Sequence, residues 1–206
     1  MMTLQQLLQF PATPEIALLL MTCVILLLEL FAEQKSSLLT YTATQMSLLI
    51  TLALVIYLHH VPAQFLFHEH FTWDLVAYFI KLCIFIFSVF AFVYARDAIK
   101  TLQMHSGEYY LLGLFSILGM LVLTSANSLL SLYLGLELLS FPLYAMVALQ
   151  RQSSQAAEAA MKYFILGALA SGLFLYGLSL LYGATHSLIL PVIHQALLVG
   201  GQSHVL

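Results

Sequence analysis

The chain of 206 residues is 62% hydrophobic, and only 7% of its residues are charged. A soluble domain carries charge on about a quarter of its residues, so these side chains cannot cover a water-facing surface. Lipid must therefore solvate most of the outside of the protein. The net charge of -3, without a basic patch, excludes nucleic acid as a partner.

Apolar segments of about 20 residues, which is the length that crosses a bilayer, recur along the chain. We place six spans, near residues 14–31, 38–58, 72–95, 109–126, 129–149 and 157–182. The sequence thus predicts an all-α, polytopic transmembrane helix bundle over residues 1–186. Residues 187–206 form a short apolar tail, which is either an interfacial segment or the beginning of a truncated continuation.

The orientation of the bundle follows from the basic residues outside the spans. They lie in the first, third and fifth connections and are Lys35, Arg96, Lys100 and Arg151. Short loops rich in Lys and Arg stay in the cytoplasm. The odd loops are therefore predicted to be cytoplasmic and the N-terminus to lie outside.

The second connection, residues 59–70, would then face outward. It holds four histidines, His59, His60, His68 and His70. His68 and His70 flank Glu69 and could bind a metal, although a solvated loop is the simpler interpretation.

Two cysteines, Cys23 and Cys83, lie in apolar runs without a CxxC pattern. Such residues are typically buried apolar thiols rather than disulfide or metal sites.

Glu137 is the residue that most strongly indicates a function. It lies about eight residues from one end of the fifth predicted span, which at 1.5 Å per residue is near the bilayer centre. An ionised carboxylate there costs about 3 kcal/mol on insertion scales. Glu137 should therefore face the protein interior, pair with a cation or hold a proton; a neutral structural glutamate is the alternative.

Pro142 lies five residues after Glu137 on the same predicted helix. Because proline has no amide hydrogen, the carbonyl of Leu138 loses its helical partner. The free carbonyl could hold water beside the buried acid, or the kink could serve packing alone.

Two lysines lie inside predicted spans. Lys162, some five residues into the sixth span, could carry a proton, influence the Glu137 proton as a nearby cation, or anchor the helix at the interface. Lys81, in the third span, is a weaker auxiliary candidate, with Asp74 seven residues before it as a solvated cap. Glu29 and Glu108 lie near helix ends and are interpreted as structural.

Small residues between 167 and 172 of the sixth span, Gly167, Ala168, Ala170, Ser171 and Gly172, predict close helix packing within the chain or against a partner. The sequence contains no Walker loop, dinucleotide fingerprint or haem motif.

Three stretches resemble a known family, the antiporter-like membrane subunits of respiratory complex I. They are GEYYLL at 107–112, ANSLLSLYLGLELLSFPLY at 126–144 and EAAMKYFILGALASG at 158–172. The resemblance implies that Glu137 and Lys162 are the fifth-helix glutamate and sixth-helix lysine of a proton channel. It also implies a bacterial inner-membrane subunit that binds no cofactor, with NADH, FMN, iron-sulfur clusters and quinone bound by other subunits of the complex.

The chain departs from the family pattern after its sixth span. Members of the family continue with a broken seventh helix and an eighth helix that carry further channel lysines. Three functions therefore stay open: a proton-translocating membrane-arm subunit of NADH-quinone oxidoreductase or the N-terminal part of one, a piece of a multisubunit cation/proton antiporter, and a non-conducting membrane fragment.

Overall fold

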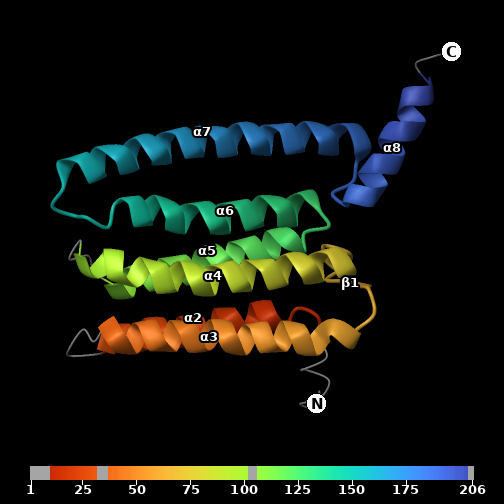
Figure 1. Ribbon diagram of the computed structural model, residues 1–206. Coiled ribbons are helices and arrows are strands. Elements are labelled where there is room, and N and C mark those ends of the chain that lie inside the picture. Colours follow the sequence, from red (N-terminus) through yellow and green to blue (C-terminus); the bar gives the residue numbers. More distant parts are fainter. Residues whose placement is uncertain (1–9, 32–36, 102–105, 204–206) are drawn as a thin grey trace.

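The computed structural model describes residues 10–31, 37–101 and 106–203 (Figure 1). Its α-helices are α2 (Thr13–Phe31), α3 (Ser37–Tyr57), α4 (Leu75–Thr101), α5 (Ser106–Thr124), α6 (Leu129–Val147), α7 (Ser154–Thr185) and α8 (Leu190–Ser203). Six of these described helices, α2 to α7, are long and apolar enough to cross a membrane. The predicted all-α bundle of six spans is confirmed.

Polar residues mark where the helices begin and end. Ser128 and Ser153 precede α6 and α7, and each side chain accepts a hydrogen bond from a backbone N–H of the first turn. These N-caps satisfy donors that the helix itself leaves unpaired. His186 follows α7 in the left-handed conformation, with φ of 52°, and so ends the longest of the described helices.

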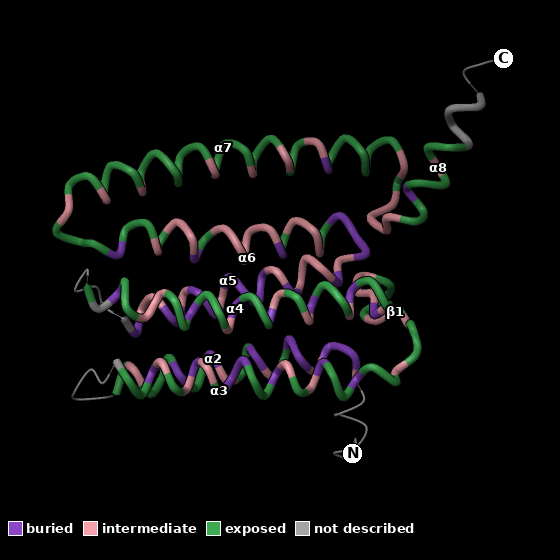
Figure 2. The backbone as a smooth tube through the Cα atoms, viewed as in Figure 1, coloured by how far each residue is buried: buried purple, intermediate pink, exposed green. Residues whose placement is uncertain are grey.

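The six spans lie roughly side by side, with α2 and α3 along one edge, α4 and α5 in the middle, and α6 and α7 along the other edge (Figure 1). Buried residues are frequent in the middle of this row of helices and rare in α7 (Figure 2). In the most apolar 18-residue stretch of α5, 56% of the residues are buried, against 0% for α7. The packed core therefore lies among α2 to α5, and α7 lies at the edge of the described bundle.

Helices α5 and α6 approach each other closely through two glycines. A Cβ atom at Gly119 would lie 2.7 Å from the carbonyl carbon of Leu138, and one at Gly135 would lie 2.8 Å from the backbone nitrogen of Leu123. Small residues at a membrane helix interface allow such backbone contact. This contact fixes α6, which carries Glu137, against the core.

We call the end of the bundle that carries residues 58–74 the outer end, following the predicted orientation. Residues 59–70 were expected to form a loop, but the chain forms a 3₁₀ turn (Leu58–His60) and an antiparallel hairpin of β1 (Gln64–Leu66) and β2 (Phe71–Trp73). Helix α4, the third predicted span, consequently begins at Leu75 rather than near Thr72.

At the opposite, inner end, α4 continues to Thr101, so Arg96 and Lys100 lie in the helix and not in the predicted connection. The Arg96 guanidinium lies 4.7 Å from the ring centre of Tyr41 in α3. This cation–π contact lets the charged side chain pack within the helical segment. Arg151 lies between α6 and α7, as predicted, and Lys35 lies outside the described residues.

The prediction that both cysteines are buried is wrong, because Cys23 and Cys83 are free and exposed on the surface of the bundle. Faces toward lipid and toward the core are both apolar, so an apolar run does not show which way a thiol points. In the tail after residue 186, α8 leaves the outer end of α7 at an angle (Figure 1). The predicted division of the chain at residue 186 stays a prediction.

Candidate functional site

Glu137 lies near the middle of α6, eight residues after Leu129 and ten before Val147. At 1.5 Å per residue it is about 12 Å from the outer end of the helix. Its side chain is half-buried and points toward α7, where the Ser171 hydroxyl donates a hydrogen bond to Glu137 Oε1. The carboxylate is thus held between two helices.

A second hydroxyl lies close to this contact. The Oγ atom of Ser171 is 3.5 Å from the phenol oxygen of Tyr133, which precedes Glu137 by one helical turn. Hydroxyl groups both donate and accept hydrogen bonds. Tyr133, Ser171 and Glu137 therefore form a short polar chain between otherwise apolar helix faces.

Pro142 is buried inside α6, where it deprives the Leu138 carbonyl of its helical donor. The neighbouring carbonyl, that of Leu139, accepts a hydrogen bond of 3.4 Å from the buried Ser116 in α5. The weakened stretch of α6 therefore lies against α5 near Gly119.

Lys162 is separated from Glu137 in the structure. It lies nine residues before Ser171 on α7, about 13 Å nearer the inner end. Its Nζ atom is 2.6 Å from Glu158, and both side chains are exposed, at 71% and 65%. The two main sequence candidates are thus on adjacent helices, but the described residues do not bring them into contact.

Lys81, the auxiliary candidate, is the most deeply buried charge among the described residues, with a side-chain exposure of 0%. Its Nζ atom is 2.5 Å from Oε1 of Glu15 in α2, which is also buried. Asp74 instead accepts a hydrogen bond of 2.7 Å from the Ala77 amide, which confirms its expected role as a cap of α4.

Sequence reasoning missed Glu15. It follows Pro14 in the first turn of an apolar helix, where an acidic residue is ordinary because it complements the helix dipole. The only sequence signal was the presence of Lys81 in a span without a nearby partner.

Glu29 and Glu108 make local contacts near the inner end. Thr40 donates a hydrogen bond to Glu29, and Arg151 lies 2.8 Å from Glu108. These contacts agree with their interpretation as structural residues.

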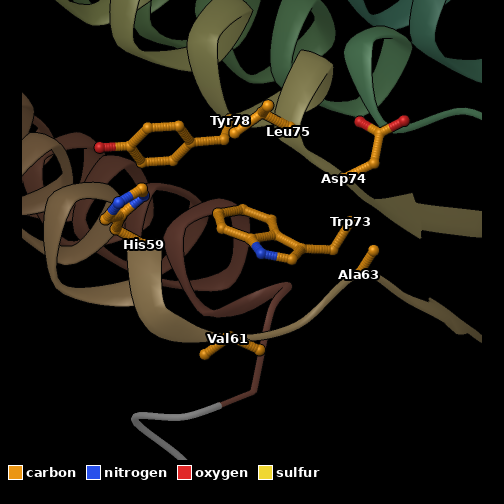
Figure 3. A pocket seen from close by; sticks show the side chains of 7 residues that line it. All are labelled: His59, Val61, Ala63, Trp73, Asp74, Leu75 and Tyr78. Carbon is orange, nitrogen blue, oxygen red and sulfur yellow. The ribbon is translucent and has the colours of Figure 1, made fainter.

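A cavity of about 180 Å³ opens beside the hairpin at the outer end (Figure 3). His59, Trp73 and Tyr78 line it together with Val61, Ala63, Asp74 and Leu75. The Asp74 carboxylate points away from the three rings (Figure 3). His70, predicted to be part of a solvated loop, lies with its Nδ1 atom 2.7 Å from Ser128 Oγ.

A family model and several curated proteins match this chain. A family model described as NADH:quinone oxidoreductase/Mrp antiporter, TM, matches residues 126–205. NADH-quinone oxidoreductase subunit N of Thioalkalivibrio sulfidiphilus is 44% identical over 93% of this chain and 40% of its own length. The same subunit of Halorhodospira halophila is 49% identical over 89% of this chain and 38% of its own length.

Two solved structures share the fold. A chain of respiratory complex I from Thermus thermophilus with bound aureothin matches with a TM-score of 0.72 and 32% identity, over 89% of this chain and 41% of that one. A chain of the archaeal membrane-bound sulfane sulfur reductase matches with a TM-score of 0.73 at 20% identity, over 90% of this chain and 39% of that one. The second likeness concerns the fold alone.

The six long apolar helices and the half-buried carboxylate in one of them define a polytopic membrane protein. Over most of its length the chain is similar to membrane subunits of respiratory complex I, and residues 126–205 match the antiporter family model. It spans about 40% of the length of the curated relatives that it matches. The bacterial relatives and the six apolar helices place it in a bacterial inner membrane.

Proposed function

We propose that the chain is a proton-translocating membrane-arm subunit of NADH-quinone oxidoreductase, or the N-terminal part of one. The observation that carries this proposal is the position of Glu137, near the middle of a membrane-spanning helix and hydrogen-bonded to a hydroxyl of the next helix. A carboxylate at this depth is costly and is typical of proton pathways.

In this proposal Glu137 gains and loses a proton. Ser171 and Tyr133 orient its carboxylate, and their hydroxyls can pass a proton by donating one hydrogen while accepting another. The kink at Pro142 loosens the helix next to Glu137, where a free carbonyl could bind a water molecule.

Lys162 would act on Glu137 as a cation at a distance. With about 13 Å along the helix between Lys162 and Ser171, direct proton transfer to Glu137 needs intervening water. Its pairing with Glu158, one helical turn away, would compete with any influence on Glu137.

The chain is proposed to bind no redox cofactor itself. NADH, FMN, iron-sulfur clusters and quinone would be bound elsewhere in the complex, and the other membrane subunits would be its partners. The relatives that are named NADH-quinone oxidoreductase subunit N support this assignment.

The test is Glu137→Gln in the assembled complex, with proton pumping measured per NADH oxidised in membrane vesicles. Glutamine keeps the shape of the side chain and can still accept a hydrogen bond from Ser171, but it cannot release a proton. Loss of a proton-transfer group slows its step by about 100-fold, so proton flow through this subunit should nearly cease.

The matched control is Glu108→Gln, which changes the same residue type in the ion pair with Arg151. It should assemble and pump like the wild type. Wild-type pumping by the Glu137→Gln complex would contradict the proposed role of Glu137.

A second candidate is a subunit piece of a multisubunit cation/proton antiporter, which the description of the matching family model also names. Sodium-dependent proton flux in vesicles without quinone or NADH would favour it. Proton flux that requires quinone reduction would favour the complex I assignment.

A non-conducting fragment is the third possibility, since the most apolar stretch of α7 has none of its residues buried among the described ones. Blue-native electrophoresis of gently solubilised membranes separates it from the others. Comigration with NADH dehydrogenase activity supports a working subunit, and migration only as a small free species supports the fragment.

A further inference from the structure

The buried pair of Glu15 and Lys81 has no place in the proposed proton path. Apart from their ion pair of 2.5 Å, neither carboxylate oxygen of Glu15 nor Nζ of Lys81 has a hydrogen-bond partner among the described residues. A buried charge needs its counter-charge. The pair therefore joins the beginning of α2 to α4 through one contact.

The Lys81 ammonium also contacts the outer hairpin. Its Nζ atom lies 4.9 Å from the ring centre of Phe71 and 4.7 Å from that of Trp73. These residues are two apart on β2 and so share one face of the strand. Because the ammonium is desolvated, its cation–π contacts are at the strong end of their range. One buried cation thus holds β2 against the bundle.

The hairpin is in turn bonded to the connection between α5 and α6. The Thr72 amide donates to the Ser125 carbonyl at 2.9 Å, and the Asn127 amide donates to the His70 carbonyl at 3.1 Å. The Ser131 hydroxyl, in the first turn of α6, also donates to the His70 carbonyl at 2.7 Å.

The contacts continue to the N-cap of α6, since His70 Nδ1 lies 2.7 Å from Ser128 Oγ. Ser128 precedes α6 as its N-cap, and Glu137 lies nine residues after it. A continuous chain of contacts therefore runs from Lys81 through the hairpin to the helix that carries the proposed proton carrier.

From these contacts we infer that Lys81, held in place by Glu15, is a positioning residue that fixes the outer hairpin and, through it, the beginning of α6. The effect on Glu137 rests on the proposed function. The effect on the hairpin does not, because it concerns contacts within this chain alone.

Trp73 reports directly on this inference, because it is the only tryptophan in the sequence. Its ring contacts Lys81 and borders the outer cavity, while the residue is only 2% exposed. Acrylamide, which would reach the ring through this cavity, should quench its fluorescence weakly in the 206-residue chain in lipid nanodiscs.

The first variant is Lys81→Met, which should raise the quenching constant about twofold or more as the hairpin opens locally. Lys81→Arg keeps a cation that stacks on aromatic rings and should restore weak quenching. Lys162→Met removes an exposed lysine instead and should leave Trp73 quenching unchanged.

Lys81→Met leaves Glu15 without a counter-charge, so this variant could fail to fold. The double variant Glu15→Leu with Lys81→Met removes both charges, which is often neutral or stabilising for the fold. It should keep the helical circular dichroism of the wild type and still show increased quenching. Unchanged quenching in the folded double variant overturns the inference.

Proton pumping by the assembled complex tests the link to Glu137. The double variant should lower pumping, with Glu137→Gln measured alongside it. Normal pumping by the double variant, while Glu137→Gln is defective, overturns the link. If Glu137→Gln also pumps normally, the proposed function fails, and the quenching result still decides the role of Lys81 in the hairpin.

Discussion

One hydroxyl group of α7 contacts the Glu137 carboxylate, and the lysine of α7 is paired with another residue. Ser171 donates to Glu137, whereas Lys162 is 2.6 Å from Glu158. A carboxyl group keeps an oxygen that can accept a hydrogen bond whether or not it carries a proton. The contact with Ser171 is therefore compatible with the proposed role of Glu137 as a proton carrier.

Ser171→Ala should alter the Glu137 carboxyl group directly. Without the hydroxyl donor, the C=O stretching band of protonated Glu137 should move to higher frequency, and the chain should lose about 1 kcal/mol of stability. Infrared difference spectra against Glu137→Gln identify the band. Ser179→Ala, which removes an exposed hydroxyl bonded to the Tyr176 carbonyl on the same helix, should leave the band unchanged.

The depth of Glu137 could be predicted because helix rise converts residue number into distance. The partner of Lys81 could not, because Glu15 lies 66 positions earlier and its direction depends on how α2 is rotated. In a soluble helix the polar face reveals that rotation. In α2 the faces toward lipid and toward the core are both apolar, so the sequence lacks that signal.

The backbones of α5 and α6 lie close together at Gly119 and Gly135. Helix packing in lipid depends on such van der Waals contact because no hydrophobic effect drives two spans together. The position of α6 should therefore be sensitive to a single added methyl group.

Gly119→Ala should destabilise the chain by about 1–3 kcal/mol, since the new Cβ would meet the backbone of α6 and both helices would have to shift. Unfolding in mixed detergent micelles measures this change. Gly172→Ala is the matched control, because nothing lies within 4 Å of its Cβ position. It should be neutral or stabilising, and an equal loss in both variants would contradict the close contact.

The small residues at 167–172 lie on two faces of α7, so packing within the chain accounts for only part of the predicted close contact, and packing against a partner stays a prediction. Gly167 lies against Tyr144, and Ser171 contacts Glu137, but Ala168, Ala170 and Gly172 are exposed. The hairpin was missed, because its strands are only three residues long and lie in a segment rich in histidine. Tertiary contacts, rather than periodicity, decide the structure of this segment.

Across the whole molecule, the hairpin lies at one end of the six spans and the connection between α6 and α7 lies at the other (Figure 1). That connection contains Arg151. The positive-inside rule assigns the end with Arg151 to the cytoplasm.

Single cysteines test this orientation in a chain whose native thiols are replaced by Cys23→Ala and Cys83→Ala. A membrane-impermeant thiol reagent added to intact spheroplasts should label His68→Cys but not Gln152→Cys, since both positions are exposed but lie at opposite ends. Permeabilised cells should label both. Labelling of Gln152→Cys in intact spheroplasts would reverse the orientation.

The connection between α5 and α6 also sets an order for biosynthesis. Its backbone is hydrogen-bonded to the hairpin, which is synthesised earlier. It is also bonded to residues that are synthesised later, because the Leu190 amide donates to the Asn127 carbonyl. Next to it, the Leu129 amide donates to the Leu188 carbonyl. These last partners reach the outer surface only after α7 has crossed the bilayer. The hydrogen bonds at the outer end are therefore expected to form in two steps during synthesis. The bonds with the hairpin form after α5 is inserted, and the bonds with residues 188–190 form after α7 is inserted.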